Sequence, residues 1–369
     1  MVTLPISAFT MTHHPIIEED IRNIAEDLRR YAPQLSGTTL LLTGGAGFLG
    51  KYIVYTLDYM NKHIFQKPCK IIVLDNFITG IKELAIDPNY ISLVHHDVSQ
   101  PYQTDEHLDY IFHAASIASP VFYKKYPLET LDVGTLGTRN MLELAKQKHV
   151  KSILFFSSSE VYGDPDPKFV PTPETYHGNV SCIGPRACYD EAKRVGETYA
   201  VNYHQIHRVP VKIIRPFNIY GPGMKLDDRR VVPNFVLAAL KGEKIPLYGG
   251  GQHTRTFCYI SDAITGIFQV LLSQYNGEPF NIGSDGQEIS MESLANIISE
   301  QFGNGVHISH VVGPNDAYEK ADPQRRSPDL RKIRTFVGYE PKTDVVTGLK
   351  RFIVWAKDQD ISQFSVHIK

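Results

Sequence analysis

Cysteine is scarce in this sequence. Four cysteines occur among 369 residues, and none belongs to a pair or cluster with the spacing of metal ligands. A chain of this length can form a sizeable core without disulfides, so reduced thiols in the cytoplasm are expected. We therefore predict no metal site and a structural packing role for each cysteine, namely Cys69, Cys182, Cys188 and Cys258.

An excess of charge of one sign is also lacking. The chain has 38 Lys and Arg against 40 Asp and Glu, which gives no reason to expect a nucleic acid or an anionic membrane as a partner. No apolar run approaches the roughly 20 residues that span a bilayer. The early stretch HHPIIEEDIRNIAEDLRR has acids where a signal peptide would have basic and then apolar residues. We predict a cytoplasmic globular protein.

The first 36 residues contain apolar side chains at helical spacing. Ile17, Ile21, Ile24 and Leu28 recur at intervals of three or four. Acids come early and arginines late, as the helix dipole prefers. We predict an amphipathic N-terminal arm over residues 1–36 that packs on the body of the protein or on a sister subunit.

Short runs rich in Leu, Ile and Val alternate with longer helical patterns from Thr38 onward. The runs are TTLLLT, KIIVLD, YISLVHHD, DYIFHAA, SILFFSSS and VKIIRPF. Near-continuous apolar strands with helices between them are typical of a doubly wound parallel sheet. The predicted fold is therefore α/β of the Rossmann type, with the dinucleotide-binding domain over residues 37–220.

After the segment FNIYGPG the sequence changes to loops rich in Gly, Pro and Arg. Helical patterns follow in RVVPNFVLAALKG, MESLANIISEQFG and RKIRTFVG. We predict a smaller C-terminal α/β substrate-binding domain over residues 221–369, with an interleaved boundary. It would cap the carboxyl edge of the sheet, where open α/β sheets bind ligands.

A glycine-rich turn links the first predicted strand to the next helix. In TTLLLTGGAGFLGKYIVYTL, Gly44, Gly47 and Gly50 allow a tight turn and let a pyrophosphate approach the N–H groups at the positive end of the helix. Asp75 ends the second strand, where a carboxylate accepts hydrogen bonds from ribose hydroxyls and repels a 2′-phosphate. Asp97 follows the third strand, where it can bind the adenine amino group. The pattern predicts NAD; the alternative is that both carboxylates only stabilise turns.

A polar cluster ends the predicted strand SILFF. Three serines and Glu160 follow it, at the carboxyl edge beside the expected nicotinamide. In the helical segment CYDEAKRVGETYAVNYH, Tyr189 and Lys193 lie four apart on one face. A lysine ammonium favours a nearby phenolate and lowers the tyrosine pKa from about 10 toward working pH. Tyr189 would then take a proton from a substrate hydroxyl, while Ser158 hydrogen-bonds the same oxygen.

The chain resembles the nucleotide-sugar-modifying branch of the extended short-chain dehydrogenases/reductases. The resemblance lies in the motifs TGGAGFLG, LDNF, HAASIASPVFY, SSSEVYGDP, GPRACYDEAKR, FNIYGPG, GGGQHTRTFCYISD and DPQRRSPDL, and it is strongest to the UDP-glucuronate decarboxylases, also called UDP-xylose synthases. It runs from about Thr38 to Trp355. It implies tightly held NAD, a nucleotide-sugar substrate and a homodimer paired through the helices of LGTRNMLELAKQ and CYDEAKRVGETYAVNYH.

Roles of single residues follow from this resemblance. The implied catalytic residues are Ser158, Glu160, Tyr189, Lys193 and the late arginine of the family, Arg326 in QRRSPDL. The cofactor residues are Gly44, Gly47, Phe48, Leu49, Gly50, Asp75, Asn76, Asp97, Val98, Ala114, Ala115, Tyr189 and Lys193. The substrate residues are Ser116, Asn218, Arg230, Tyr248, Gln252, Arg255 and Arg326.

The chemistry that the resemblance implies needs no metal. Oxidising C4 of a hexuronate places a ketone β to the carboxylate, so the electrons released with carbon dioxide flow into an enolate. Glu160 would position or relay a proton, and Arg326 would stabilise charge or assist protonation at C5. The alternatives are that Glu160 only caps the following turn and that Arg325 and Arg326 are solvated charges.

One position departs from the family, and other reactions stay open. The Asn usually found in N-x-x-G-T is Gly134 here, in DVGTLGT, which leaves the exact sugar open.

A nucleotide-sugar 4,6-dehydratase is one alternative, although Ser159 replaces the acid of the thymidine-type enzymes. A 4-epimerase is another, although epimerases usually lack an acid at the position of Glu160. An alternative of another class is a catalytically silent NAD-binding partner protein, but Tyr189 and Lys193 are both present.

Overall fold

The computed structural model describes residues 13–80, 84–303, 305–311, 323–364 and 366. Residues 1–12 of the predicted arm lie outside the described residues. Asp322, the first residue of the motif DPQRRSPDL, also lies outside the described residues.

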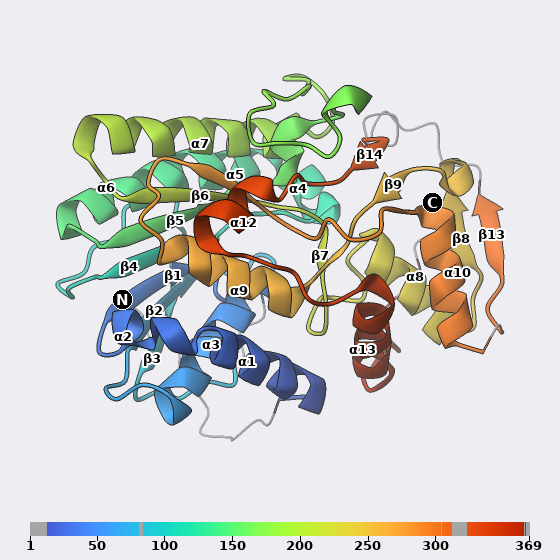
Figure 1. Cartoon of the computed structure of the whole chain (residues 1–369), viewed down its shortest axis with the longest axis horizontal. Helices are drawn as coiled ribbons and strands as arrows, with labels where there is room; N and C mark the ends of the chain where they lie inside the picture. The colour runs from blue at the N-terminus through green and yellow to red at the C-terminus, as the bar shows by residue number, and fades with distance from the viewer. Residues whose placement is uncertain (1–12, 81–83, 304, 312–322, 365, 367–369) are drawn as a thin grey trace.

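A seven-stranded sheet forms the centre of the molecule, in the order β11-β6-β5-β4-β1-β2-β3 (Figure 1). Every neighbouring pair in it is parallel. The strands are β1 (Thr39–Thr43), β2 (Lys70–Asp75), β3 (Ile91–His95), β4 (Tyr110–His113), β5 (Ser152–Phe156), β6 (Val211–Pro216) and β11 (Pro279–Ile282). The first six are the six predicted apolar runs, and the predicted doubly wound α/β fold is confirmed.

Two features of this sheet were not predicted. Residues 96–109 connect β3 to β4 without a helix, so the expected alternation of strands and helices is wrong there. The seventh strand, β11, comes from the range predicted as the C-terminal domain and pairs with β6. It has four residues and begins with a proline, a pattern that gives little strand signal. The proposed division into domains stays a prediction.

Helices cover both faces of the sheet (Figure 1). Leu40 and Leu42 of β1 face one core, which also contains residues of several helices, and Leu41 faces the other core. This alternation follows from the two-residue period of a strand. The helices include α3 (Phe48–His63) and α9 (Ile260–Leu271) on the first face, and α6 (Thr138–Lys148) and α7 (Ala187–His207) on the second.

The N-terminal arm forms helix α1 (Pro15–Asp27), which packs against α3 and α9 of its own chain. Ile21, Ile24 and Leu28 are buried there. His14 caps the helix by accepting a hydrogen bond from the backbone N–H of Ile16. The described part of the arm therefore packs on the body of its own chain, which is one of the two predicted arrangements.

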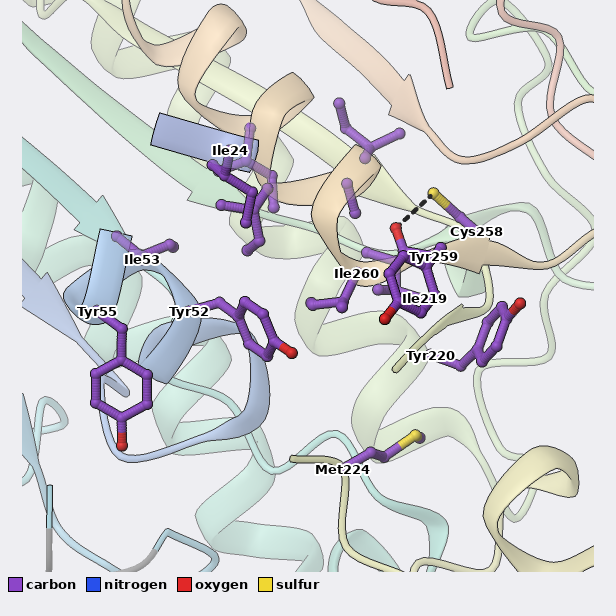
Figure 2. Close-up of a cluster of buried hydrophobic side chains, with 14 of the residues drawn as sticks. Ile24, Tyr52, Ile53, Tyr55, Ile219, Tyr220, Met224, Cys258, Tyr259 and Ile260 are labelled. Carbon is purple, nitrogen blue, oxygen red and sulfur yellow. Dashed lines mark hydrogen bonds between the residues drawn. The ribbon is translucent and has the colours of Figure 1, made fainter. Parts of the chain in front are cut away.

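A buried carboxylate joins α1 to distant parts of the chain. Asp20 accepts hydrogen bonds from the hydroxyl of Tyr259 at 2.8 Å and from Arg351 at 2.8 Å. The hydroxyl of Tyr52 lies 3.4 Å from the same carboxylate. Figure 2 shows Tyr52 and Tyr259 reaching toward each other from α3 and from strand β10 (Cys258–Tyr259). The arm is thus tied to the C-terminal helix that carries Arg351.

The C-terminal part of the chain forms smaller sheets beside the main one (Figure 1). Its strands pair as β10-β7, β12-β9-β14 and β13-β8. The three predicted helices are present as α8 (Val231–Leu240), α10 (Met291–Gln301) and α12 (Arg331–Val337). The other elements are α2 (Ala32–Leu35), α4 (Pro120–Lys125), α5 (Pro127–Asp132), α13 (Val345–Lys357), β7 (Ile219–Tyr220), β8 (Ile245–Tyr248), β9 (Thr254–Arg255), β12 (Ile289–Ser290), β13 (Ile308–Val311) and β14 (Arg325–Arg326).

The cysteines are all free thiols. Cys69 and Cys258 are buried and Cys188 is partly buried, which agrees with a packing role. Cys182 is exposed, so the packing role predicted for it is wrong: it lies in the loop before α7.

Among the described residues, no cluster of His, Cys, Asp and Glu could hold a metal ion. Within the same part of the chain, no helix has both the length and the apolar character of a membrane span.

Candidate active site

The glycine turn between β1 and α3 is packed too closely for side chains. Gly44 has a φ of +73°, and a Cβ there would lie 2.8 Å from the backbone of Ala115. A Cβ at Gly50 would lie 2.2 Å from the carbonyl oxygen of Gly44. Gly47 precedes α3 and supplies no side-chain cap. The positive end of a 16-residue helix is therefore open to an anionic group.

A cavity of about 230 Å³ lies at this helix end. Its walls include most of the predicted cofactor residues and two predicted substrate residues, which are Gly44, Gly47, Phe48, Leu49, Gly50, Asp75, Asn76, Val98, Ala114, Ala115, Ser116 and Arg230. Lys51 and Lys225 also line it, and they were not predicted. Burial and the charge of Lys225 lower the pKa of Lys51 to about 8, which is the response of a cation that lacks a nearby anion.

Asp75 stabilises the turn in the described structure. Its carboxylate accepts hydrogen bonds from the backbone N–H groups of Ala46 at 2.9 Å and Phe77 at 2.8 Å. Burial raises its pKa. A carboxylate has about four lone-pair positions, so these two bonds leave room for ribose hydroxyls. The turn role is observed, and the ribose role stays a prediction.

Asp97 lies outside the cavity wall among the described residues. Its carboxylate accepts a hydrogen bond from the backbone N–H of Ser99 at 2.9 Å, and the side-chain amide of Asn76 lies 3.4 Å away. Although its partial burial alone would raise the pKa, these hydrogen bonds lower it. These contacts do not test the predicted contact of Asp97 with the adenine, which stays a prediction.

The serine and the tyrosine predicted to work together do meet. Ser158 follows β5, and the side chain of Tyr189 hydrogen-bonds to it. Tyr189 is 7% exposed, and its ring stacks on Tyr123 with centroids 5.4 Å apart. Lys193 donates to the carbonyl of Phe156 at 2.6 Å, and its Nζ lies 5.7 Å from the centre of the Tyr189 ring. The strand end and the helix face are thus brought together as predicted.

The electrostatics of this pair differ from the sequence-based expectation. Burial raises the pKa of Tyr189 to about 12, although the hydrogen bond with Ser158 acts in the opposite direction. Burial lowers the pKa of Lys193 itself to about 7. The expected lowering of the tyrosine pKa toward working pH is therefore absent in the protein alone, because the same burial disfavours both the phenolate and the ammonium.

Glu160 is held between two arginines. Arg326 approaches both of its oxygens, with Nη1 2.8 Å from Oε1 and Nη2 3.0 Å from Oε2. Arg186 forms an ion pair with Oε2. All three side chains are at most 14% exposed. The alternatives of a turn cap for Glu160 and a solvated Arg326 are therefore wrong, whereas Arg325 pairs with Glu288 at 2.8 Å.

Arg186 and Asp190 are members of this cluster that the sequence analysis did not assign. The Nε atom of Arg186 lies 3.6 Å from Oδ2 of Asp190, one turn later, and Oδ1 of Asp190 has no hydrogen-bond partner. Burial, together with the charge of Glu160, raises the pKa of Asp190 to about 7. The signal that could have found them is their i, i+4 spacing around Tyr189 in GPRACYDEAKR.

The other predicted substrate residues lie at different distances from this centre. Arg230 lines the cavity and pairs with Asp228 through two bonds of 2.6 and 3.0 Å. Arg255 is buried and donates to the carbonyls of Pro323 and Gln324 at 2.5 and 3.1 Å. It thereby holds the segment that carries Arg326, since β9 and β14 pair in parallel with Arg255 opposite Arg326.

Five predicted substrate residues are absent from the described cavity wall, namely Arg255 and Arg326, described above, and Asn218, Tyr248 and Gln252. Asn218 has a positive φ of 41° and donates to the carbonyl of Thr256 at 2.9 Å. Gln252 is exposed, and its amide donates to the carbonyl of Gly250 at 3.2 Å. Tyr248 is partly buried at the end of β8. Their contacts with a nucleotide sugar stay predictions.

The parallel sheet, the glycine turn at its carboxyl edge and the Ser–Tyr–Lys group beside it define a Rossmann-type enzyme that uses a dinucleotide. Comparison with known proteins makes this specific. The chain belongs to the NAD dependent epimerase/dehydratase family, whose model matches residues 40–283. It is therefore an NAD-dependent enzyme, and the alternative of a silent binding protein is set aside.

Curated relatives extend the match over most of the chain. UDP-glucuronic acid decarboxylase 5 of Arabidopsis thaliana is 41% identical over 317 residues, which cover 85% of this chain and 88% of the relative. UDP-glucuronic acid decarboxylase 1 of Xenopus tropicalis is 40% identical over 346 residues, with coverages of 91% and 78%. Among solved structures, the dTDP-glucose 4,6-dehydratase DesIV of Streptomyces venezuelae, with NAD bound, has a TM-score of 0.76 at 26% identity, with coverages of 88% and 98%.

Proposed function

We propose that the protein converts UDP-glucuronate to UDP-xylose and carbon dioxide, with NAD reduced and reoxidised within each turnover. The observation that carries this proposal is the arginine pair around Glu160, beside Tyr189, in a chain whose curated relatives are named UDP-glucuronic acid decarboxylases. Guanidinium groups bind carboxylates through two parallel hydrogen bonds. An arginine pair at the sugar position therefore suits a uronate better than a neutral hexose.

The residues around the cavity fit NAD. The uncapped start of α3 offers backbone N–H groups to a pyrophosphate, and Lys51 and Lys225 add positive charge near it. Asp75 retains lone pairs for ribose hydroxyls, and its charge disfavours a 2′-phosphate. When bound, NAD accepts a hydride from C4 of the sugar and later returns it.

Tyr189 is the proposed base for the C4 hydroxyl. Its hydrogen bond with Ser158 supports the proposal that both side chains bind one substrate oxygen. Loss of the tyrosine proton must overcome the burial that raises its pKa to about 12. Lys193 lies close enough to stabilise the phenolate whenever it carries its proton.

The second half of the reaction takes up one proton. The ketone at C4 lies β to the carboxylate, so the C5–C6 bonding electrons pass into an enolate as carbon dioxide leaves. Protonation of that enolate at C5 re-forms the C4 ketone before the hydride returns. Glu160 and Arg326 are proposed to guide this step, because they lie together within reach of the Tyr189 region.

Incubation with a panel of nucleotide sugars tests this proposal. The protein, supplied with NAD, is mixed separately with UDP-, GDP- and dTDP-linked sugars, and the products are weighed by mass spectrometry. We expect UDP-glucuronate to lose the mass of carbon dioxide. Loss of the mass of water from a neutral nucleotide hexose would instead identify a 4,6-dehydratase, and altered chromatographic mobility at constant mass would identify a 4-epimerase.

We also propose a homodimer. The two segments named in the sequence analysis each expose an apolar side chain, Leu136 at 47% and Val195 at 38%. Leu128 on the adjacent α5 is 70% exposed. A twofold axis beside α7 would bury such side chains against their copies. Because α7 carries Tyr189 and Lys193, the proposed interface also supports the site.

A cytoplasmic location is part of the same proposal. Cys69 and Cys258 are buried as free thiols, which suits a reducing compartment. Fractionation of the source cells with an antibody against the protein tests it, and recovery from an oxidising, secretory compartment would contradict it.

A further inference from the structure

One face of helix α7 binds the end of strand β5. Tyr189, Lys193 and Glu197 recur at intervals of four along α7, so they share this face. Their partners are consecutive in the chain, namely Phe156, Ser157 and Ser158. The contacts of Tyr189 and Lys193 are described above, and the third is a hydrogen bond of 2.5 Å from the Ser157 hydroxyl to the Glu197 carboxylate. Three successive turns of the helix therefore bind three successive residues of the strand end.

Ser157 lies where the chain leaves the sheet. Its backbone N–H donates to the carbonyl of Ile214 on β6 at 2.9 Å. Two residues further along β6 is Pro216, which has no N–H to continue the ladder. Ser158 follows outside the strand and precedes the short helical turn Ser159–Tyr162. The direction of the chain at Ser157 therefore decides where the Ser158 hydroxyl lies.

Glu197 is itself fixed by Arg215 of β6. Nε of Arg215 donates to Oε1 at 2.8 Å and Nη2 donates to Oε2 at 2.6 Å, which is the two-bond geometry of a guanidinium with a carboxylate. Both side chains are at most 14% exposed. Nη1 of Arg215 donates to the hydroxyl of Tyr162 at 2.8 Å and to the carbonyl of Glu174 at 3.0 Å. The carboxylate is therefore a rigid acceptor for the Ser157 hydroxyl.

Glu197 also acts on Lys193, one turn earlier in α7. Burial lowers the pKa of Lys193 to about 7, and the charge of Glu197 acts in the opposite direction. A carboxylate near a buried lysine favours the ammonium form. Glu197 thus supports two members of the Ser–Tyr–Lys group, the lysine through charge and the serine through its neighbour Ser157.

We propose that Glu197 is a positioning residue for the first step of the reaction. It fixes Ser157, and through Ser157 it fixes the Ser158 hydroxyl against Tyr189, while Arg215 holds Glu197 in place. This rests on the proposed role of Tyr189 as the base for the C4 hydroxyl, and it deepens that role. A base and a hydrogen-bond donor that share one substrate oxygen tolerate little misplacement, because a shift of about 1 Å can slow a reaction roughly 100-fold.

Ser157→Ala tests the link, because it removes the bond to Glu197 and leaves the ion pair of Glu197 with Arg215 in place. We expect NADH formation in a single turnover with UDP-glucuronate to slow about 10- to 100-fold. The affinity for UDP-glucuronate should stay within about 2-fold, since geometry and not binding is changed. A crystal structure of the variant should show a longer distance between the hydroxyls of Ser158 and Tyr189.

The matched control is Ser152→Ala, at the other end of the same strand. Ser152 is also buried, and its hydroxyl also binds a buried charged side chain, accepting from Lys212 at 2.8 Å. Both variants lose one such bond, so both should lower the melting temperature to a similar extent. Ser152→Ala should keep NADH formation within about 2-fold of wild type, because a loss of stability alone does not move the strand end beside Tyr189.

A replacement of the buried ion pair tests Glu197 itself. Changing Glu197 alone would leave the Arg215 charge unpaired in the core, whereas Glu197→Leu combined with Arg215→Met removes both charges, which folded proteins often tolerate. This double variant should slow NADH formation at least as much as Ser157→Ala. Adding Ser157→Ala to it should slow the step by less than about 3-fold more, since the hydroxyl has then already lost its partner.

Three results would overturn the positioning role. They are equal rates of NADH formation in Ser157→Ala and Ser152→Ala, a loss of UDP-glucuronate affinity as large as the loss of rate, and a full additional effect of Ser157→Ala in the double variant. Failure of the proposed function is read separately, from Tyr189→Phe that reduces NAD at the wild-type rate or from wild-type protein that forms no NADH with UDP-glucuronate. In the latter case the nucleotide sugar of the panel that does reduce NAD replaces it, and the serine variants are compared as before.

Discussion

Tyr189 lies where burial disfavours the phenolate that its proposed role requires. Its pKa is raised to about 12, and that of Lys193, four residues later, is lowered to about 7. The same desolvation acts on both groups with opposite effects on their pKa values. Below a pH of about 7 the lysine is mainly charged and can stabilise the phenolate, and above it this help fades. The proposed role of Tyr189 therefore requires a further positive charge, which oxidised NAD would supply when bound.

The first prediction concerns the separate roles of Tyr189 and Glu160. Tyr189→Phe should reduce NADH formation by about 10² to 10⁴ and leave substrate binding largely intact, because a general base is lost. Glu160→Gln should slow carbon dioxide release more than NADH formation, so a 4-keto species or bound NADH accumulates. Single-turnover absorbance of NADH, read beside carbon dioxide release, distinguishes them. Wild-type rates of NAD reduction in Tyr189→Phe would refute the proposed site.

At the residue scale, the sequence predicted the parts of the site that follow local patterns. Ser158 comes directly after a buried strand, and Tyr189 and Lys193 share a helix face, so their meeting could be anticipated. The contacts of Glu160 could not, because Arg186 is 26 and Arg326 is 166 positions away. A charged residue at such a separation has the same sequence signature as a solvated one. The raised pKa of Tyr189 also depends on burial, which only the tertiary structure fixes.

At the scale of elements, the contact between α7 and the segment Val133–Gly137 is unusually close. That segment has π-helical hydrogen bonding, which often occurs near functional sites. A Cβ at Gly134 would lie 2.6 Å from the Cβ of Ala192 on α7. The Asn usual in the family therefore has no room in this packing, which gives a physical reason for the departure seen in the sequence.

The second prediction follows from this close packing. Gly134→Ala should lower the free energy of unfolding by about 1–3 kcal/mol through overpacking. It should also reduce activity, because the displaced helix carries Tyr189 and Lys193. Gly184→Ala is the control, since its Cβ would meet Ser181 at an ordinary 3.4 Å. Equal melting temperatures for the two variants would show that the contact can relax freely.

The third prediction concerns helix α1 and pH. Burial raises the pKa of Asp20 from 3.8 to about 6, although Arg351 acts in the opposite direction. Between these values the folded state binds more protons than the unfolded state, so the free energy of unfolding should fall as pH rises from about 4 to about 6. Asp20→Asn should abolish this part of the pH dependence in thermal melting. The control is Asp27→Asn, which changes another carboxylate of helix α1 and removes a partner of Lys342. This variant should keep the pH dependence.

Helices and strands could be predicted where their apolar residues repeat regularly along the sequence. The six apolar runs and the helices α8, α10 and α12 could be read from periodicity alone. Strand β11 could not, because four residues beginning with proline become a strand only by pairing with β6. The arm was recognisable as a helix, but its site of attachment depends on partners on α3, α9 and α13 that no local pattern connects with it.

At the scale of the whole molecule, one apolar core runs from α1 through the sheet to α13. Its members include Ile24 of the arm, Leu40 of β1 and Phe352 of the last helix. Exposed apolar side chains occur on α5, α7 and the segment before α6, and also on α12 and α13. Those of the first group lie on or beside the two segments proposed to pair, which supports the proposal that this surface is covered by a second copy of the chain.

The fourth prediction tests that surface. The double substitution Leu136→Asp with Val195→Asp should convert a dimer to a monomer, because it buries four charges per pair of chains at the proposed interface. Light scattering at micromolar concentration measures the mass. Val354→Asp on α13, where the side chain is 45% exposed, should leave the mass unchanged. A monomeric wild-type protein would contradict the proposal outright.

The contact between Asp20 and Arg351 has a consequence for the order in which the protein can be completed on the ribosome. The two residues are 331 positions apart. At translation rates of roughly 5–20 residues per second, Arg351 emerges about a quarter of a minute to a minute after Asp20. Until then the carboxylate lacks Arg351, although the apolar face of the arm can already pack on α3 and α9. The tie between the arm and the C-terminal helix is therefore among the last contacts of the chain that can form.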